Sequence, residues 1–219
     1  MAHASSSILE FHNHTKNTLS TNFIYGFEES YEPGMSLRDA CEIMLKYGDC
    51  VLPKCPGNYE HPYAHAYFKR CINAADLTAK QLSNIKSYYM CADNDAVKYA
   101  IYTYGPVLAG VDFPTDYDID RTGNIRFNKS ALKQEYHAIV IYGWDKTGFW
   151  CLNSWGKSWG KNGCFHFNYN NGMLKEARAL VPGKFELTKD KYLTMTKAAD
   201  SKNVNVLYKM INKVLNVFK

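Results

Sequence analysis

The residues best suited to chemistry lie in two stretches of the second half of the chain. His137 opens the apolar run "HAIVIYG" (137–143), and Asn153 follows the aromatic segment "GFWCL" (148–152). Short runs of β-branched and aromatic residues that end in turn residues predict buried strands. A histidine at the mouth of such a strand is a core residue, a metal ligand or a general base. Neighbouring strands would bring His137 and Asn153 side by side.

The stretch after Asn153 is the most specific in the chain. It reads "NSWGKSWGKNG" (153–163), with two Trp-Gly pairs and a further glycine before the next predicted strand. Large indole side chains are unfavourable in a loop unless they cover something. We interpret Trp159 as a packing residue of the loop itself.

Together these residues resemble the papain-like cysteine peptidases, the C1 family. That family has His-Ala before an apolar strand and a glycine, then an aromatic strand leading into Asn-Ser-Trp-Gly-x-x-Trp-Gly-x-x-Gly, and every position is present here. The segment 93–113 also looks like the family, and 33–53 looks like its bacterial and viral branches. The resemblance covers about residues 1–182.

The resemblance implies a role for each matching residue. In this family a cysteine thiolate attacks a peptide carbonyl and a histidine transfers the proton. His137 would be this general base, Asn153 would orient its ring, and Trp155 would shield their hydrogen bond and contact substrate. Ala138 would line the specificity pocket, and Gly34 would offer backbone to a bound peptide or serve as an ordinary turn glycine. No metal and no cofactor is implied.

Of the catalytic residues that the resemblance implies, the nucleophile has no match in the sequence. The family places it at the start of a small-residue helix, where the helix N-terminus lowers a thiol pKa. That helix matches "MAHASSSILEF" (1–11), so the nucleophile is expected immediately before Met1. Ser5, Ser6 and Ser7 lie too deep in the helix to replace it. His3, His12 and His14 have no specific metal-ligand spacing.

Seven cysteines are present, and an odd number excludes complete internal pairing. No pair has the spacing of a metal site, so we interpret all seven as buried thiols and not as nucleophiles. This favours a reducing compartment or a virion over secretion. The seven are Cys41, Cys50, Cys55, Cys71, Cys91, Cys151 and Cys164.

Three hypotheses about function follow. We favour a papain-like homologue without its nucleophile, acting as a non-catalytic binding or structural module, for example in a virion. The alternative is an active cysteine endopeptidase whose catalytic cysteine lies just upstream of Met1, acting on peptides or proteins. The third is a hydrolase with an unorthodox nucleophile. The initial methionine favours the first hypothesis, whereas the presence of His137, Asn153 and Trp155 together favours the second.

The pattern of elements predicts an α+β protein with two lobes. Residues 1–104 would form a helical lobe with a truncated central helix, and 105–183 an antiparallel β-barrel lobe. Helices are expected at 1–11, at 33–48 with Ser36 as the N-cap, and at 93–105 with Asp93 or Asn94 as the N-cap. A short helix at 76–89 is expected to be followed by a strand, and 20–27 to form a short strand or an extended element. Strands are expected at 107–113, 137–143, 148–153, 164–169 and 177–182.

Residues 184–219 form a predicted extension outside the family pattern. Val204, Leu207, Ile211 and Val214 share one helical face, and lysines lie elsewhere. This indicates an amphipathic helix that packs on its own domain or binds a protein partner or a membrane surface.

The composition limits the class of partner. The chain has 219 residues, 46% hydrophobic and 15% aromatic, which is typical of a folded protein with a large core. Its formal charge of +5 is diffuse and does not indicate nucleic-acid binding. No run of 18 apolar residues predicts a transmembrane segment.

Overall fold

A computed structural model describes residues 1–14, 17–27, 34–56 and 83–183. The described chain divides into two compact units. We call residues 1–88 with 180–183 the helical unit, and residues 89–179 the sheet unit. The predicted extension 184–219 and the first part of the predicted helix 76–89 lie outside the described residues.

Three helices form the helical unit, α1 (Ala2–Asn13), α2 (Thr21–Tyr25) and α3 (Leu37–Lys46), with a 3-10 turn η1 (Leu52–Lys54). The predicted helices at 1–11 and 33–48 are confirmed. Ser36 caps α3 as expected, because its hydroxyl accepts a hydrogen bond from Asp39 N at 3.1 Å.

The prediction of an extended element at 20–27 is wrong, because residues 21–25 form helix α2. Ser20 is its N-cap, and its hydroxyl accepts a hydrogen bond from Phe23 N at 3.2 Å. Phe23 and Ile24 are fully buried. The cap and this burial outweigh the strand preference of the aromatic and β-branched residues.

Strand β1 (Ile85–Met90) is the strand expected after the helix 76–89, but it begins earlier, within the last residues predicted as helix. The residues that form it, "IKSYYM", are rich in strand formers. β1 and β8 (Leu174–Pro182) carry the chain between the two units.

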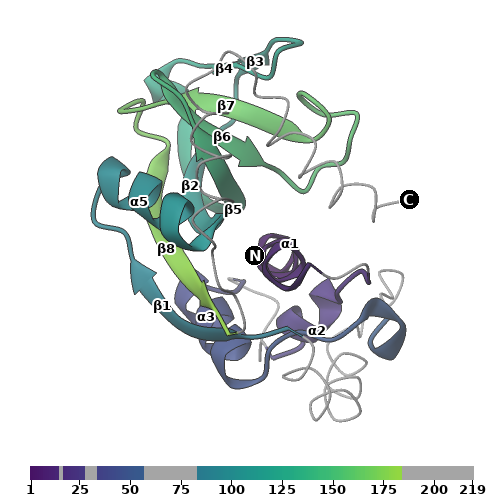
Figure 1. Cartoon of the computed structure of the whole chain (residues 1–219). Coiled ribbons are helices and arrows are strands. Elements are labelled where there is room, and N and C mark those ends of the chain that lie inside the picture. Colours follow the sequence, from purple (N-terminus) through teal and green to yellow (C-terminus); the bar gives the residue numbers. More distant parts are fainter. Residues whose placement is uncertain (15–16, 28–33, 57–82, 184–219) are drawn as a thin grey trace. The chain divides into compact units, whose positions relative to one another are not determined.

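The main sheet has six strands in the order β1-β8-β2-β5-β6-β7 (Figure 1). Its other members are β2 (Val107–Pro114), β5 (Leu132–Trp144), β6 (Gly148–Leu152) and β7 (Cys164–Asn168). From β8 through β2, β5 and β6 to β7 every neighbouring pair is antiparallel. The α+β class and the predicted strands are therefore confirmed.

The expected barrel is not closed, because β1 and β7 are the two ends of the sheet. A hairpin of two short strands, β3 (Asp118–Ile119) and β4 (Ile125–Arg126), contacts β7 instead. His166 N on β7 donates a hydrogen bond to Gly123 O of this hairpin at 2.8 Å. The edge of β7 is thus partly satisfied without closure.

Helix α5 (Asn94–Tyr104) packs on the core of the sheet unit. Asp93 caps it as predicted, accepting a hydrogen bond from Ala96 N at 2.8 Å. Its buried residues Val97 and Ile101 belong to the same core as the inner residues of β2 and β5. The predicted domain boundaries after residues 104 and 183 stay predictions, because compactness alone does not define a domain.

Candidate active site

Strand register sets the direction of His137. On β5, His137 lies opposite Val111 of β2, and Ile139 lies opposite Ala109. Directly opposed residues share a face of the sheet, and successive residues alternate. Val111 and Ile139 are core residues. His137 therefore extends the core row of the sheet, and its imidazole is half-buried at the end of that row.

The side chain of Asn153 meets this imidazole. β6 pairs with β5, and Asn153 follows the last residue of β6. His137 Nε2 lies 2.8 Å from Asn153 Oδ1. The expected adjacency of the two residues is confirmed.

A backbone hydrogen bond defines the proton position on the imidazole. Ser154 N–H donates to Asn153 Oδ1 at 2.7 Å, so this atom is the acceptor oxygen of the amide. A neutral histidine facing that oxygen must then donate from Nε2. This tautomer leaves a lone pair on Nδ1, and His137 can accept a proton at this nitrogen.

Glycines fold the loop 153–163 back on itself. Asn153 N donates to Gly163 O at 2.9 Å, and Gly163 N donates to Trp159 O at 2.8 Å. Gly160 has φ +55°, and a Cβ there would lie 2.6 Å from Cys164 O. The Trp-Gly spacing of the sequence is therefore a geometric requirement, because a side chain at Gly160 would push the loop away.

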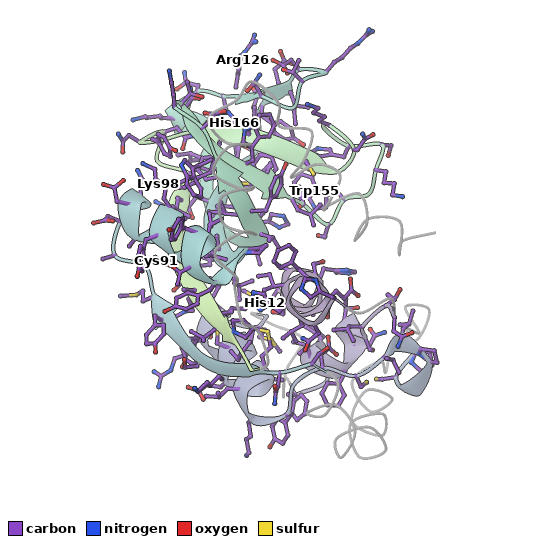
Figure 2. The ribbon with its side chains drawn as sticks, viewed as in Figure 1. His12, Cys91, Lys98, Arg126, Trp155 and His166 are labelled. Atoms are coloured by element: carbon purple, nitrogen blue, oxygen red, sulfur yellow. The ribbon has the colours of Figure 1, made fainter. Side chains whose placement is uncertain are left out.

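Trp155 covers the imidazole. Its ring centroid lies 5.0 Å from that of His137 and 4.8 Å from that of Phe113. Figure 2 labels Trp155 on the loop that follows β6. Even so, 44% of Trp155 is exposed. One side of the indole thus shields the His137–Asn153 pair from water, and another side is available to a ligand.

Trp159 packs inside the loop, which agrees with its interpretation as a packing residue. Its Nε1 donates to Tyr117 Oη at 3.0 Å, and its ring lies 5.0 Å from Trp155. It also contacts Phe165 at 5.4 Å between centroids. Trp159 therefore supports Trp155 from behind.

Burial and the hydrogen bond with Asn153 act in opposite directions on the pKa of His137. Burial lowers this pKa below its ordinary value, because an imidazolium loses hydration, whereas the hydrogen bond with Asn153 raises it. Burial is the larger effect. The ring is therefore neutral at pH 7 and ready to accept a proton.

Comparisons with known proteins decide the family. A family model described as papain family cysteine protease matches residues 36–181, more than half of the chain. The chain belongs to the papain family of cysteine proteases. Human cathepsin O is 33% identical over 89 residues, which is 39% of this chain and 27% of that protein. The viral cathepsin of Heliothis zea nuclear polyhedrosis virus is 32% identical over 95 residues, 40% of this chain and 25% of that protein.

A solved papain-type structure supports the fold. Xylellain, a cysteine protease from Xylella fastidiosa, is 20% identical and superposes with a TM-score of 0.65. The match covers 84% of this chain and 79% of that one. The matched part amounts to only about a quarter of the length of the curated relatives named above.

Two other predicted site residues have different surroundings. Ala138 is buried, and it lies opposite Gly110 on the face of the sheet away from His137. Gly34 precedes α3 in the helical unit and has φ +91°, with nothing within 4 Å of a built Cβ. The structure therefore brings His137, Asn153 and Trp155 together, and the substrate roles of Ala138 and Gly34 stay predictions.

The described cysteines are poor candidates for a papain-type nucleophile. Five of them are buried, and Cys91 is half-buried. Burial raises the pKa of the Cys91 and Cys151 thiols and raises that of Cys164 to about 11. Reactive thiolates need a lowered pKa. The buried five are Cys41, Cys50, Cys55, Cys151 and Cys164, and Cys71 lies outside the described residues.

The second histidine of the sheet unit has a structural environment. His166 on β7 is buried, and its Nε2 lies 3.3 Å from Asp145 Oδ1. Asp145 Oδ2 accepts a hydrogen bond from Trp150 Nε1 at 3.0 Å, and its Oδ1 accepts one from Thr147 N at 2.7 Å. This network holds the β5–β6 turn, and it does not include His137.

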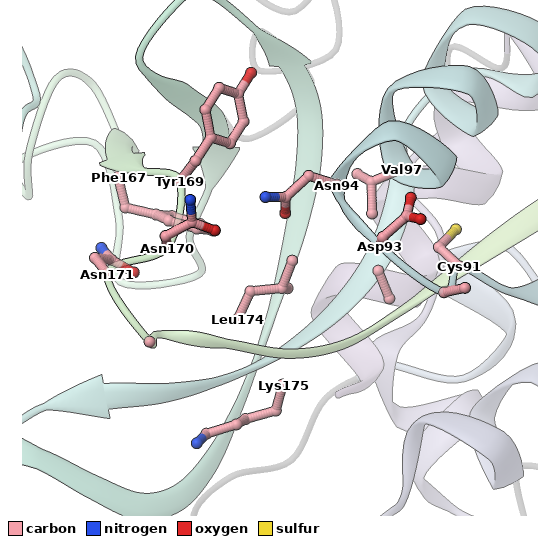
Figure 3. Close-up of a pocket in the computed structure, with 13 residues that line it drawn as sticks. Cys91, Asp93, Asn94, Val97, Phe167, Tyr169, Asn170, Asn171, Leu174 and Lys175 are labelled. Atoms are coloured by element: carbon pink, nitrogen blue, oxygen red, sulfur yellow. The ribbon is translucent and has the colours of Figure 1, made fainter.

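A pocket of about 270 Å³ lies elsewhere on the sheet unit, between the start of α5 and the β7–β8 turn (Figure 3). Asparagine side chains and an aromatic ring contribute to its wall, and none of the papain-type residues lines it. Residues around it include Cys91, Asn94, Tyr169, Asn170 and Asn171. Separately, no helix within the described ranges combines the length and the apolar character that crossing a membrane requires.

Sequence reasoning missed two residues that complete the site. Phe113 ends the core row of β2, and its ring contacts those of His137, Trp155 and Tyr117. The available signal was weak: an aromatic residue at a strand end before a proline. Tyr117 carries no signal, because only the folded loop brings its hydroxyl to Trp159.

Proposed function

We propose that the sheet unit supplies the proton-transfer half of a cysteine peptidase, with His137 as the general base. The carrying observation is the hydrogen bond of 2.8 Å between His137 Nε2 and Asn153 Oδ1. It fixes the tautomer and directs Nδ1 toward proton transfer. The nucleophile would be a cysteine at the position immediately before Met1. The substrate would be a peptide or protein.

In the proposed reaction Nδ1 of His137 transfers the proton, and Nε2 remains hydrogen-bonded to Asn153. Nδ1 takes the proton of the thiol, which yields a thiolate and an imidazolium. The thiolate attacks the peptide carbonyl, and Nδ1 returns the proton to the leaving amine as the C–N bond breaks. Water then hydrolyses the thioester, with His137 acting again as base. Asn153 holds the ring in plane throughout and stabilises the imidazolium.

An unfavourable feature of Asn153 supports a functional role. Its Nδ2 is buried and has no hydrogen-bond partner among the described residues. An unsatisfied buried donor costs about 1–3 kcal/mol. An apolar residue at this position would avoid this cost. We therefore infer that the role of Asn153 is to orient His137 and not to stabilise the fold.

The substrate contacts are proposed from resemblance and register. Trp155, exposed on one side, would contact the peptide next to the cleaved bond. Ala138 would line the specificity pocket, and Gly34 would hydrogen-bond the peptide backbone. Gly110 separates Ala138 from Glu176 on the same face of the sheet, and Glu176 is paired with Arg178 at 3.0 Å.

A non-catalytic binding or structural module is the second candidate. The observation that favours it is the raised pKa of the Cys91, Cys151 and Cys164 thiols. None of these three would supply a thiolate at neutral pH. The same observation weighs against a hydrolase with an unorthodox cysteine nucleophile.

The test uses protein isolated from its natural source. Its intact mass is measured, and it is treated with an epoxide reagent that alkylates active-site thiols and with a fluorogenic peptide. We expect labelling at a cysteine preceding Met1 and peptide hydrolysis. His137→Ala should lower kcat by at least about a thousandfold, since base and nucleophile act as a unit. His14→Ala, at an exposed histidine of α1's C-cap, is the matched control.

A native mass of 25.0 kDa with neither labelling nor hydrolysis would overturn the peptidase proposal and leave the binding module. Hydrolysis by such a protein that survives His137→Ala would also overturn it.

The extension 184–219 is proposed as the site of a protein partner. The support is its amphipathic sequence pattern. Deleting it should abolish assembly with that partner in size-exclusion chromatography, without changing peptide hydrolysis. Unchanged assembly with lower thermal stability would instead mean that it packs on its own domain.

A further inference from the structure

The imidazole of His137 is held on more sides than the hydrogen bond with Asn153 accounts for. The Phe113 ring meets it edge-on, with centroids 5.5 Å apart and planes at 83°. Trp155 lies against it at 5.0 Å and 37°. Asn153 fixes one ring nitrogen, but a single hydrogen bond still permits the ring to tilt.

Phe113 reaches this position through the regular alternation of β2. Val111 lies opposite His137, and Phe113 is the next residue of β2 on the same face. The β2–β5 register shifts between Asp112 and Pro114, and the extra residues of this irregularity lie on β5. Phe113 remains 93% buried, since its exposed fraction is 7%.

Phe113 is also the common contact of the aromatic groups around the site. Its ring lies 4.8 Å from Trp155, 5.4 Å from Tyr117 and 5.8 Å from Phe165, measured between centroids. Phe165 contacts Phe113 and Trp159, and no ring contact joins it to His137 in this part of the structure. Among the core aromatics described here, Phe113 and Trp155 alone contact the imidazole.

We propose that Phe113 is a positioning residue, which locks the plane of the His137 imidazole between itself and Trp155 so that Nδ1 keeps one direction. This inference rests on the proposed function for its catalytic meaning, and its geometric part is independent of it. A packed aromatic edge resists tilting of the ring, whereas Trp155, being partly exposed, supports it from one side only. Misplacement of a catalytic group by about 1 Å can cost about a hundredfold in rate.

The geometric test uses the chain as given. Phe113→Leu and Phe113→Met keep an apolar side chain of similar volume and remove the flat edge. Phe165→Leu is the matched control, because it disturbs the same cluster without contacting the imidazole. His137 is observed by NMR in each variant, through the titration of its Cε1 proton and the signal of its Nε2 proton.

We expect the Phe113 variants to raise the pKa of His137 toward its ordinary value, because the freed ring gains water. The Nε2 proton should exchange faster with solvent. Phe165→Leu should change neither signal. Unchanged signals in a folded Phe113 variant would overturn the proposal, and so would equal changes in Phe165→Leu. Failure of both Phe113 variants to fold, with Phe165→Leu folded, would assign Phe113 to stability and would also overturn it.

The catalytic test uses the native peptidase. Phe113→Leu should lower kcat about 10- to 100-fold with KM nearly unchanged, since ring alignment acts after the substrate binds. If the native protein hydrolyses no peptide, the proposed function is contradicted, whereas the NMR result on the orientation of His137 remains valid. If the native protein hydrolyses peptide and Phe113→Leu leaves its kcat unchanged, only the positioning role is contradicted.

Discussion

The helical unit and the sheet unit both contain ionisable side chains whose pKa is shifted by burial. In the helical unit two such groups are buried acids, Glu10 and Asp49, each hydrogen-bonded to backbone. In the sheet unit one such group is a half-buried base, His137, hydrogen-bonded to an amide. Burial raises the pKa of both acids and lowers that of the histidine, so all three are neutral in the fold over part of the pH range.

The acids and the histidine differ in the hydrogen bonds that they make. Asp49 accepts hydrogen bonds from Ser6 Oγ at 2.6 Å and Cys50 N at 2.8 Å, and Glu10 accepts one from Leu19 N at 2.7 Å. Through these bonds Asp49 joins helix α1 to a segment 43 positions away, and Glu10 joins it to Leu19, nine positions away. His137 makes one such bond and keeps Nδ1 available. The acid pair therefore reads as structural, and the imidazole as a group kept ready for chemistry.

Replacing Asp49 should have the largest effect on stability. Asp49→Ala leaves two buried donors without an acceptor, and we expect a loss of about 2–4 kcal/mol in the free energy of unfolding. Urea denaturation followed by circular dichroism measures it. Asp49→Asn keeps an acceptor and should cost about 1 kcal/mol. Asp39→Ala, at an exposed N-cap pair, is a control. A loss in Asp49→Ala no larger than in this control would remove the structural role.

The pH dependence of the helical unit should come next in size. Burial raises the pKa of Glu10 to about 7 from its ordinary value of 4.5, while the bond from Leu19 N opposes this. The folded state then holds a proton that the unfolded state loses, so stability is highest below pH 4.5 and falls as pH rises through 7. We expect a decrease of about 2–3 kcal/mol between pH 5 and 8.

Hydrogen exchange of α1 amides localises this effect in the helical unit. Glu10→Gln keeps the acceptor for Leu19 N and removes the charge, so it should remove the part of the profile that titrates near pH 7 and leave the contribution of Asp49. Glu42→Gln, at an exposed glutamate of α3, should leave it unchanged. Equal pH dependence in sheet amides would show that the comparison between the units is wrong.

The sequence predicts one half of this comparison far better than the other. His137 and Asn153 belong to a local pattern, in which strand alternation and the Asn-Ser-Trp-Gly run indicate their adjacency. The pairing of Ser6 with Asp49 depends on a contact across 43 positions, and no periodicity carries that information. Buried acids are also rare enough that neither was expected in a core.

The fold shows the same division. Helices with a cap and a long amphipathic face, such as α3, were predictable from Ser36 onward. Helix α2 has five residues, too few for a periodic signal, so its aromatic and β-branched residues were interpreted as extended. The ring contacts of Phe113 with Trp155 and Tyr117 depend on how the loops after β6 and β2 fold, and strand alternation alone does not predict them.

Asn153 tests the sheet unit with the smallest expected effect on stability. Its hydrogen bond raises the pKa of His137 against the larger lowering by burial. Asn153→Ala should therefore lower this pKa further, and Asn153→Asp should raise it, because a carboxylate stabilises the imidazolium. NMR titration of the His137 Cε1 proton measures both.

The sign of the pH effect then runs opposite to that of Glu10. A depressed histidine pKa gives stability that is present above the ordinary value of 6.5 and is lost as pH falls through the folded pKa. Asn153→Ala should enlarge this loss and extend it to lower pH, because the folded pKa moves further below 6.5. A raised His137 pKa in Asn153→Ala would mean that Asn153 acts mainly by excluding water from the ring. In that case Trp155 and Phe113, and not the amide, would set the chemistry of His137.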